Sequence, residues 1–402
     1  MLRTLLDVLH ALGDILPQNP PMSLSWYRRA AEQGKVGAQL FVGTAYFHGQ
    51  GVPQDYAEAY RWYRKAAEQD NAEAQCALGV MYCSGQGVTL DYAEACKWYR
   101  KAAEQGNAAA QCALGSRYMT GQGVPQDYAE ACNWYRKAAE QGNADAECAL
   151  GVMYRSGQGV TIDYAEAFGW WRRAAEHGNI SAQVLVGGAY CNGEGVSQDY
   201  AEAVRWLRRA ADRGHALAQL LLGSRYARGE GVPLDYFEAV QWHRKAAEQG
   251  KTGAQLFLGT AYFHGQGVPQ DYAEARKWFC RAAEQDNTEA QCALGVMYCS
   301  GQGMPQDYAE ACKWYRKAAE QGNAAAQWSL GIQYMHGQGV PQDYAGAHMW
   351  FNLAASRACG EDRKKYASAR DLVAEQMTPE QIDEAQRLAR EWKPKPAVTA
   401  KD

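Results

Sequence analysis

The chain has 402 residues, with 41 Lys or Arg, 45 Asp or Glu and a formal net charge of −4. Basic and acidic residues are mixed along it, and no block rich in lysine or arginine is present, which argues against a nucleic-acid partner. No run of about 18 apolar residues occurs, so no membrane-spanning helix is expected.

The first predicted segment, residues 1–21, consists of an amphipathic helix and a proline-rich linker. Five leucines recur at helical spacing: Leu2, Leu5, Leu9, Leu12 and Leu16. Charged and polar residues interrupt the apolar stretch that an export signal requires. We therefore expect this helix to cap the chain's main array or to lie on it, and a cleaved signal remains the alternative.

The main array is a repeat with a period of 36 residues, which is typical of a solenoid. Its clearest marker is a tryptophan that recurs without insertion or deletion: Trp26, Trp62, Trp98, Trp134, Trp170, Trp206, Trp242, Trp278, Trp314 and Trp350. A longer similarity relates residues 35–111 to residues 251–327, six units further on, and indicates a block duplication.

Each unit is predicted to form two antiparallel helices, as in residues 107–142. Asn107 is a good N-cap for the first helix, and a turn of glycines and a proline follows at residues 121–125. Asp127 caps the second helix, with a glutamate three residues later at the spacing of a capping box. Gly115 lies inside the first helix, where glycine is unfavourable, so we expect the paired helix to approach closely there.

The sequence thus predicts an all-α solenoid of 36-residue helix-turn-helix repeats. A lone second helix followed by nine full units occupies residues 22–357. Two capping helices are expected in residues 358–392, the second opening at Thr378 with a capping box and a proline. Residues 393–402 are predicted to be a disordered tail.

Ten of the twelve cysteines occupy repeat positions where other units carry apolar residues, so we interpret these as small buried hydrophobic residues with free thiols. The alternative is a disulfide within each hairpin, such as Cys76 with Cys96, in an oxidising compartment.

No motif for catalysis or for a cofactor is found. The chain has no S-x-x-K, G-x-S-x-G, H-E-x-x-H or C-x-x-C sequence. His48 and His264 share a repeat position but lie six units apart, so they are not expected to meet at one metal. We expect no cofactor and no metal.

The repeat pattern resembles that of the Sel-1-like repeat family. In residues 107–142 it consists of Ala110, Leu114, Gly115, Tyr118, Gly121, Gly123, Val124, Asp127, Tyr128, Ala131, Trp134, Ala138, Ala139 and Gly142. The resemblance implies a right-handed α/α superhelix, similar to tetratricopeptide repeats, that acts as a scaffold or adaptor. One cysteine-rich branch of the family is implicated in binding or hydrolysing β-lactams through disulfide-bonded repeats. This chain has Ala139 where that branch has a cysteine, which puts such an activity in doubt.

By analogy with tetratricopeptide packing, a variable stripe on the first helices would line the concave face and bind a partner. We call these fifteen residues the A-helix stripe: Phe47, His48, Val80, Cys83, Ser116, Met119, Arg155, Asn192, Arg228, Thr260, Phe263, Trp328, Ile332, Met335 and His336. Its apolar character favours a protein or peptide with hydrophobic anchors.

We therefore expect a non-catalytic, monomeric, cytoplasmic scaffold that binds a partner protein or peptide. The alternatives are a β-lactam-binding or β-lactamase-like enzyme, and an exported protein that contacts a host or the cell envelope.

Overall fold

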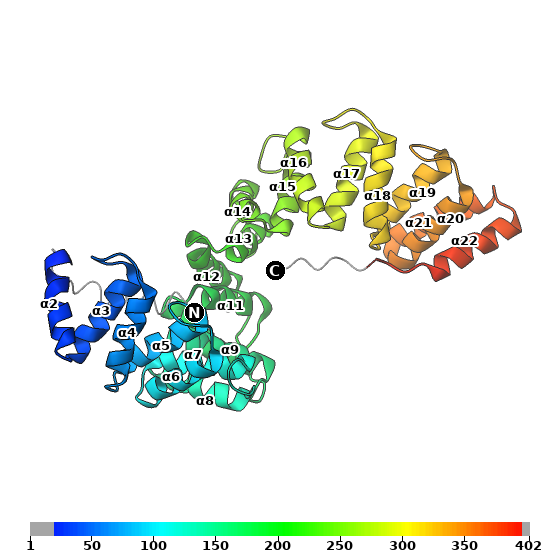
Figure 1. Ribbon diagram of the computed structural model, residues 1–402. Helices are drawn as coiled ribbons and strands as arrows, with labels where there is room; N and C mark the ends of the chain where they lie inside the picture. Colours follow the sequence, from blue (N-terminus) through cyan, green and yellow to red (C-terminus); the bar gives the residue numbers. More distant parts are fainter. Residues whose placement is uncertain (1–19, 396–402) are drawn as a thin grey trace. The chain divides into compact units, whose positions relative to one another are not determined.

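The computed structural model describes residues 20–395, and every regular element in this range is an α-helix (Figure 1). Two compact units, residues 1–209 and 210–402, divide the chain, and each is described by itself. In each unit the helices pack in sequence order, each against the next from α2 (Pro20–Glu32) to α11 (Ile180–Asn192) and from α13 (Ala216–Arg228) to α21 (Gly360–Ala374). The helix predicted near the N-terminus falls on residues 1–19, which lie outside the described residues, as do residues 396–402 of the predicted tail.

The repeats have the two helices predicted for them, which we call the A helix and the B helix. The A helices are α3 (Val36–His48), α5 (Ala72–Ser84), α7 (Ala108–Thr120), α9 (Ala144–Ser156), α11 (Ile180–Asn192), α13 (Ala216–Arg228), α15 (Thr252–His264), α17 (Thr288–Ser300) and α19 (Ala324–His336). The B helices are α2 (Pro20–Glu32), α4 (Tyr56–Ala67), α6 (Tyr92–Glu104), α8 (Tyr128–Glu140), α10 (Tyr164–Glu176), α12 (Tyr200–Asp212), α14 (Tyr236–Glu248), α16 (Tyr272–Glu284), α18 (Tyr308–Glu320) and α20 (Tyr344–Arg357).

Local sequence sets the ends of these helices. Oδ1 of Asn107 accepts a hydrogen bond from the backbone N–H of Ala110 at 2.9 Å and caps α7. Gly121 ends α7 with a φ of 69°, a conformation that favours glycine. The second turn glycine, Gly123, is needed for a different reason. A Cβ atom there would lie 2.1 Å from the carbonyl oxygen of Tyr92 in the preceding repeat, so the turn reaches back onto its neighbour.

The B helices are capped by aspartate. Oδ1 of Asp127 accepts from the backbone N–H groups of Ala129 and Glu130 at 2.9 and 3.0 Å. A full capping box is recorded at α22 instead, where Thr378 and Gln381 each accept a hydrogen bond from the other's backbone.

The glycine inside each A helix is explained by a large side chain of its B helix, which is a ring in most repeats and Leu207 opposite Gly187. A Cβ atom on Gly115 would lie 3.0 Å from Cδ1 of Tyr135, and one on Gly259 would lie 2.5 Å from Cδ1 of Phe279. The close approach predicted from the sequence is therefore confirmed. Tyr135 and Phe279 are buried and form the centre of their repeats together with the small alanines of the B helix.

A ladder of buried glutamines joins each repeat to the one before it. Nε2 of Gln111 donates to the carbonyl oxygen of Ala103, in the preceding B helix, at 3.0 Å. Its Oε1 accepts from Nε2 of Gln141, at the end of its own repeat, at 2.8 Å. Gln111 is only 4% exposed, so these bonds satisfy a polar group that would otherwise be costly to bury.

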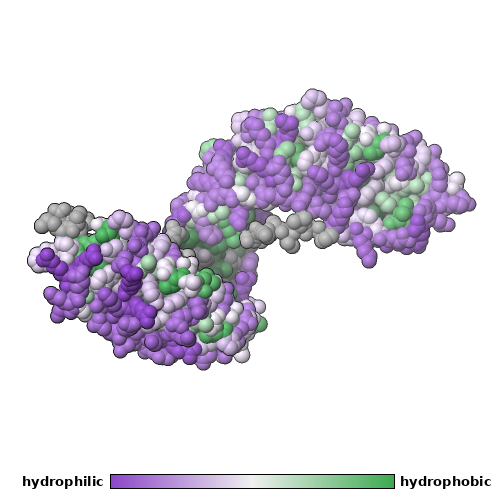
Figure 2. Space-filling model, in the orientation of Figure 1, coloured by the Kyte–Doolittle hydropathy of each residue, from purple (hydrophilic) through white to green (hydrophobic). Residues whose placement is uncertain are grey.

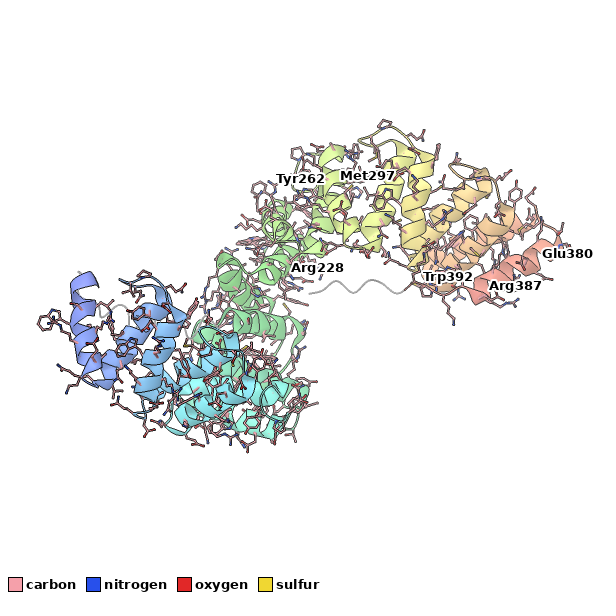
Figure 3. All side chains as sticks on the ribbon, in the orientation of Figure 1. Arg228, Tyr262, Met297, Glu380, Arg387 and Trp392 are labelled. Carbon is pink, nitrogen blue, oxygen red and sulfur yellow. The ribbon has the colours of Figure 1, made fainter. Side chains whose placement is uncertain are left out.

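Two further helices, α21 (Gly360–Ala374) and α22 (Pro379–Glu391), pack against α20 at the C-terminal end of the second unit. Trp392 follows α22 and makes an edge-on contact with Trp350 at 6.4 Å between ring centroids (Figure 3). The guanidinium of Arg357 lies 4.5 Å from the Trp392 ring. Beyond it, the backbone N–H of Lys395 donates to the carbonyl oxygen of Glu320 at 2.8 Å, which places this part of the predicted tail against the last repeats.

Candidate functional site

The A-helix stripe runs along one side of the A helices and has no member in α17. In α15, Leu258 and Gly259 face the B helix and are buried, whereas Thr260 and Phe263 are half-buried. All stripe residues except Ser116 are half-buried or exposed. Most of the surface seen in Figure 2 is hydrophilic, with small apolar patches on both units. Most stripe residues therefore keep part of their surface accessible.

Two stripe residues line a pocket between two successive A helices of the second unit, which we call the α15–α17 pocket. Its volume is about 350 Å³, within the range of small-molecule and side-chain binding pockets. The residues that line it are Leu256, Thr260, Phe263, His264, Phe279, Glu289, Ala293 and Val296. The structure thus brings Thr260 and Phe263 together with side chains of the following repeat.

The pocket walls are held in place by contacts within the repeat. The Phe263 ring makes edge-on contacts with His264 at 5.0 Å and with Tyr272 at 5.3 Å, measured between ring centroids. Nε2 of Gln270 donates to the carbonyl oxygen of Phe263 at 2.8 Å. Oγ1 of Thr260 donates to the carbonyl oxygen of Leu256 at 3.1 Å, so its hydroxyl is satisfied internally. The pocket is therefore preformed and mainly apolar.

The duplicated block in the first unit carries the same side chains with one difference. Phe47 again contacts a histidine, His48, at 5.0 Å between ring centroids, and Tyr56 at 5.3 Å. Tyr63 occupies the position of Phe279, and its hydroxyl donates to Oγ1 of Thr44 at 3.2 Å. The base of this region therefore carries a buried hydroxyl that the α15–α17 pocket lacks.

Four further stripe residues of the first unit pack partly into the core. Val80 and Cys83 pack against the core of their repeat, and Met119 likewise packs against the core of its own repeat. Burial raises the pKa of the Cys83 thiol, and the nearby Arg117 opposes this shift. Ser116 is buried and hydrogen-bonds with the hydroxyl of Tyr135. These residues offer the stripe little protruding surface.

The polar stripe residues are exposed. Nε of Arg155 lies 2.7 Å from Oε1 of Glu194, in the turn of the following repeat, so this arginine already has a partner. Asn192 is exposed at the end of α11. Arg228 is exposed at the end of α13, where Figure 3 labels it. No ion pair recorded among residues 20–395 includes Arg228.

The last four stripe residues lie next to the C-terminal cap. Trp328, Ile332 and Met335 are partly buried against a cluster that contains Phe351 and Val373, the latter from α21. The Trp328 ring stacks on the Tyr366 ring at 5.7 Å between centroids. Nζ of Lys365 lies 4.0 Å from the centroid of the Trp328 ring. His336 is exposed. The apolar part of the stripe in this repeat therefore joins the cap to the array.

Sequence reasoning did not assign six of the pocket residues to the binding surface: Leu256, His264, Phe279, Glu289, Ala293 and Val296. A signal was present for two of them. Val296 shares a repeat position with Val80 and Ile332, and His264 shares one with His48 and His336. Ala293 offered no such signal, because its contribution is the space that its small side chain leaves between two helices.

The twelve cysteines are all free thiols, and most are buried or half-buried. Burial raises the pKa of Cys76 and of Cys112 to about 12, and that of Cys96, Cys148, Cys292 and Cys312 to about 11. These groups are therefore protonated at neutral pH and are poor nucleophiles and poor metal ligands in this form.

Within residues 20–395, no group of three or more His, Cys, Asp or Glu side chains is arranged to hold a metal ion. In the same range, no helix is both long and apolar enough to cross a membrane.

Comparison with known proteins gives a consistent family match. The model of the Sel1 repeat matches ten consecutive segments: residues 8–35, 36–71, 72–107, 108–143, 144–179, 180–215, 216–251, 252–287, 288–323 and 324–359. The first segment begins at residue 8, within the part that the sequence analysis separated from the array. No curated protein matches the chain.

Two solved structures are similar over long stretches. One is c5321, described as a protective antigen of uropathogenic Escherichia coli with an SLR fold. It is 33% identical with a TM-score of 0.67, and the match covers 100% of this chain and 96% of that one. The other is a Sel1 repeat protein from Oxalobacter formigenes, 36% identical with a TM-score of 0.54, covering 61% of this chain and 96% of that one.

Proposed function

Because the chain belongs to the Sel1 repeat family, we propose that it is a non-catalytic scaffold or adaptor that binds a partner protein or peptide along its A-helix stripe. Stacked repeats present such a stripe as a long surface, so several repeats contact one partner at once. Affinity then comes from many modest contacts rather than from one deep site.

The observation that carries this proposal is the α15–α17 pocket. It lies on the stripe, its walls are apolar and preformed, and it is formed by two successive repeats. A preformed apolar pocket on an exposed helix surface suits a hydrophobic anchor of a peptide, because little ordering free energy is lost on binding.

We propose that the chain has no catalytic site, and the buried thiols support this. A cysteine nucleophile needs a lowered pKa, whereas burial raises that of Cys76 to about 12. The β-lactamase-like alternative is tested by incubating purified full-length protein with nitrocefin. We expect no saturable turnover above buffer, and saturable turnover would overturn the proposal.

We further propose that the protein is a cytoplasmic monomer that binds no nucleic acid. A second candidate is an exported protein that contacts a host or the cell envelope. The likeness to a protein described as a protective antigen favours it. Fractionation of cells that express the full-length tagged chain distinguishes the two candidates. A cytoplasmic scaffold should appear in the fraction with cytoplasmic markers, and an exported protein in the envelope or medium fraction.

The binding proposal is tested by affinity capture from the native host with quantitative mass spectrometry. The test variant is Arg155→Glu with Arg228→Glu, on the stripe. The matched control is Arg172→Glu with Arg276→Glu, two exposed arginines of B helices. Each double substitution also removes one ion pair. The stripe variant loses the pair of Arg155 with Glu194, and the control loses the pair of Arg172 with Glu176.

We expect the stripe variant to recover at least about tenfold less partner than the wild type, since like charges at an interface are strongly unfavourable. The control should recover the same amount as the wild type, and all three proteins should have the same helical circular dichroism spectrum. Equal recovery by the stripe variant and its control would overturn the assignment of the binding surface.

A further inference from the structure

The α15–α17 pocket exists because Ala293 is small. The same repeat position holds larger apolar residues in other units: Phe41, Leu185, Leu221 and Phe257. Where Phe41 or Phe257 is present, its ring packs on Tyr27 or His243 of the preceding B helix, with 4.1 and 3.9 Å between ring centroids. The equivalent space beside Ala293 lies on Phe279, which shares the repeat position of Tyr27 and His243. Ala293 leaves that space open, with Phe263 and Phe279 as its aromatic walls. A side chain of about leucine size is thus missing from this position.

The pocket has one charged end. Glu289, Ala293 and Val296 follow one another along one side of α17, and seven residues of helix separate the two ends by about 10 Å. Glu289 stands at the end nearest the start of α17. It is exposed, and no ion pair recorded among residues 20–395 includes it. The first unit has the same acidic residue, Glu73, at the equivalent position.

We propose that the α15–α17 pocket accepts one aliphatic or aromatic side chain of a partner peptide, and that Glu289 pairs with a lysine or arginine near that anchor in the peptide. This inference rests on the proposed function and specifies the partner's chemistry. The anchor supplies the apolar volume that larger residues supply in other repeats. The cation supplies a positively charged partner for the Glu289 carboxylate.

The spacing between anchor and cation follows from the pocket's length. Half of its length is about 5 Å, and alternate side chains of an extended peptide lie about 7 Å apart on the same side. We therefore expect the lysine or arginine of the peptide two residues away from the anchor. Glu289 also lies in the first turn of α17, where a carboxylate stabilises the helix. This role predicts an effect on stability but no preference among peptides, so a binding test separates the two roles.

The test uses four fluorescein-labelled Gly-Ser peptides that differ at two positions only. The anchor is Leu or Ser, and the residue two positions away is Lys or Glu. Binding to the full-length protein is measured by fluorescence polarisation. We expect the Leu–Lys peptide to bind most tightly. Replacing Leu with Ser should weaken binding about tenfold or more, and replacing Lys with Glu about two- to fivefold.

Variants are made in both copies of the duplicated block, because the first copy holds Ala77 and Glu73 at the matching positions. Ala77→Leu with Ala293→Leu should fill the α15–α17 pocket and place the same leucine in the first copy, so that binding of the Leu–Lys peptide weakens about tenfold. Leucine is already tolerated at this position in two other repeats. The control is Ala113→Leu with Ala149→Leu, the same change at the same position of other repeats, which should leave binding unchanged. Glu73→Lys with Glu289→Lys should reverse the preference from the Lys to the Glu peptide.

The inference is overturned if the four peptides bind equally or not at all, or if the filled variant binds as well as its control. If those results accompany a partner capture that depends on Arg155 and Arg228, the proposed function stands and this inference alone fails. Sedimentation velocity of the wild type and the filled variant tests a second copy of the chain as the occupant. A dimer that the filled variant converts to monomer would overturn the peptide assignment.

Discussion

Nδ1 of His177 lies 2.8 Å from Oε2 of Glu147, a carboxylate that is fully buried at the start of an A helix. In the preceding repeat the same two positions are Gln141 and Gln111, which pair through their amides. Nε of Arg173 also lies 3.2 Å from Oε1 of Glu147. One rung of the glutamine ladder thus consists of ionisable residues instead of two amides, and both positions differ together.

The first prediction concerns this rung. Glu147→Gln and His177→Gln should each destabilise the protein by about 1–2 kcal/mol, because each leaves one partner of a buried hydrogen bond poorly satisfied. The double variant recreates the Gln–Gln pair of the other repeats, so its loss should be smaller than the sum by about 1 kcal/mol. Urea unfolding of the four proteins measures this difference. Strict additivity would show that the two residues are not energetically coupled.

The second prediction concerns pH. His243 is buried, stacks on Phe257 at 3.9 Å between ring centroids, and has a pKa lowered by burial to about 4 from 6.5. The unfolded chain binds this proton more readily than the folded chain. The stability that neutral His243 provides is therefore complete above pH 6.5 and is lost as the pH falls towards 4, at most about 3 kcal/mol.

His243→Phe should remove this part of the pH dependence, because the next repeat already holds Phe279 at the same position. Urea unfolding at pH 7 and pH 4.5 measures it, with exposed His336→Phe as the control. Burial also lowers the pKa of His348, so a smaller acid sensitivity should remain. An unchanged difference between the two pH values in the His243 variant would contradict this account.

The third prediction compares two glycines of A helices. Gly259→Ala should destabilise the protein by about 1–3 kcal/mol, because its Cβ atom would lie 2.5 Å from Cδ1 of Phe279. Gly188→Ala should stabilise it by up to about 1 kcal/mol, since a Cβ atom there meets nothing within 4 Å and alanine favours the helix. Thermal unfolding of both variants decides the matter, and two shifts of the same sign would argue against the close approach.

The fourth prediction concerns the thiols. Cys359 is exposed, whereas Cys76 and Cys112 are buried with pKa values raised to about 12. In the native protein at pH 8, Ellman's reagent should therefore react fastest with Cys359, and Cys359→Ser should remove this fast phase. Denaturation without a reductant should then expose all twelve thiols. A count that is lower by an even number would support the disulfide-bonded alternative.

The period predicted the helix pairs well, because caps, turn glycines and apolar spacing act within one repeat. Asn107, Gly115 and Asp127 have the roles expected of them. Contacts between repeats were less predictable. Gln111 is a polar residue near the start of a helix and would be expected on the surface, yet it is buried against the preceding B helix.

The binding surface shows the same limit. Thr260 and Phe263 were identified by their variation, but the pocket also needs the small side chain of Ala293 in the next repeat. Trp328, Ile332 and Met335 were assigned by treating the last repeat like the others. In the structure they pack against the cap, whose helices were predicted but whose contact with these residues was not. Such contacts depend on which residues two segments bring together, and periodicity does not contain that information.

The glutamine ladder has a consequence for the length of the protein. Gln111 binds a carbonyl oxygen eight residues before it and an amide thirty residues after it, and the equivalent residues of other repeats bind at the same separations. An in-frame loss or gain of 36 residues between repeats that carry this Gln–Gln pair therefore joins two half-repeats that already match. Recombination between the duplicated blocks, residues 35–111 and 251–327, would shorten the array by six repeats without creating a mismatched interface. The number of repeats can thus change in a single genetic event while each remaining interface keeps its bonds.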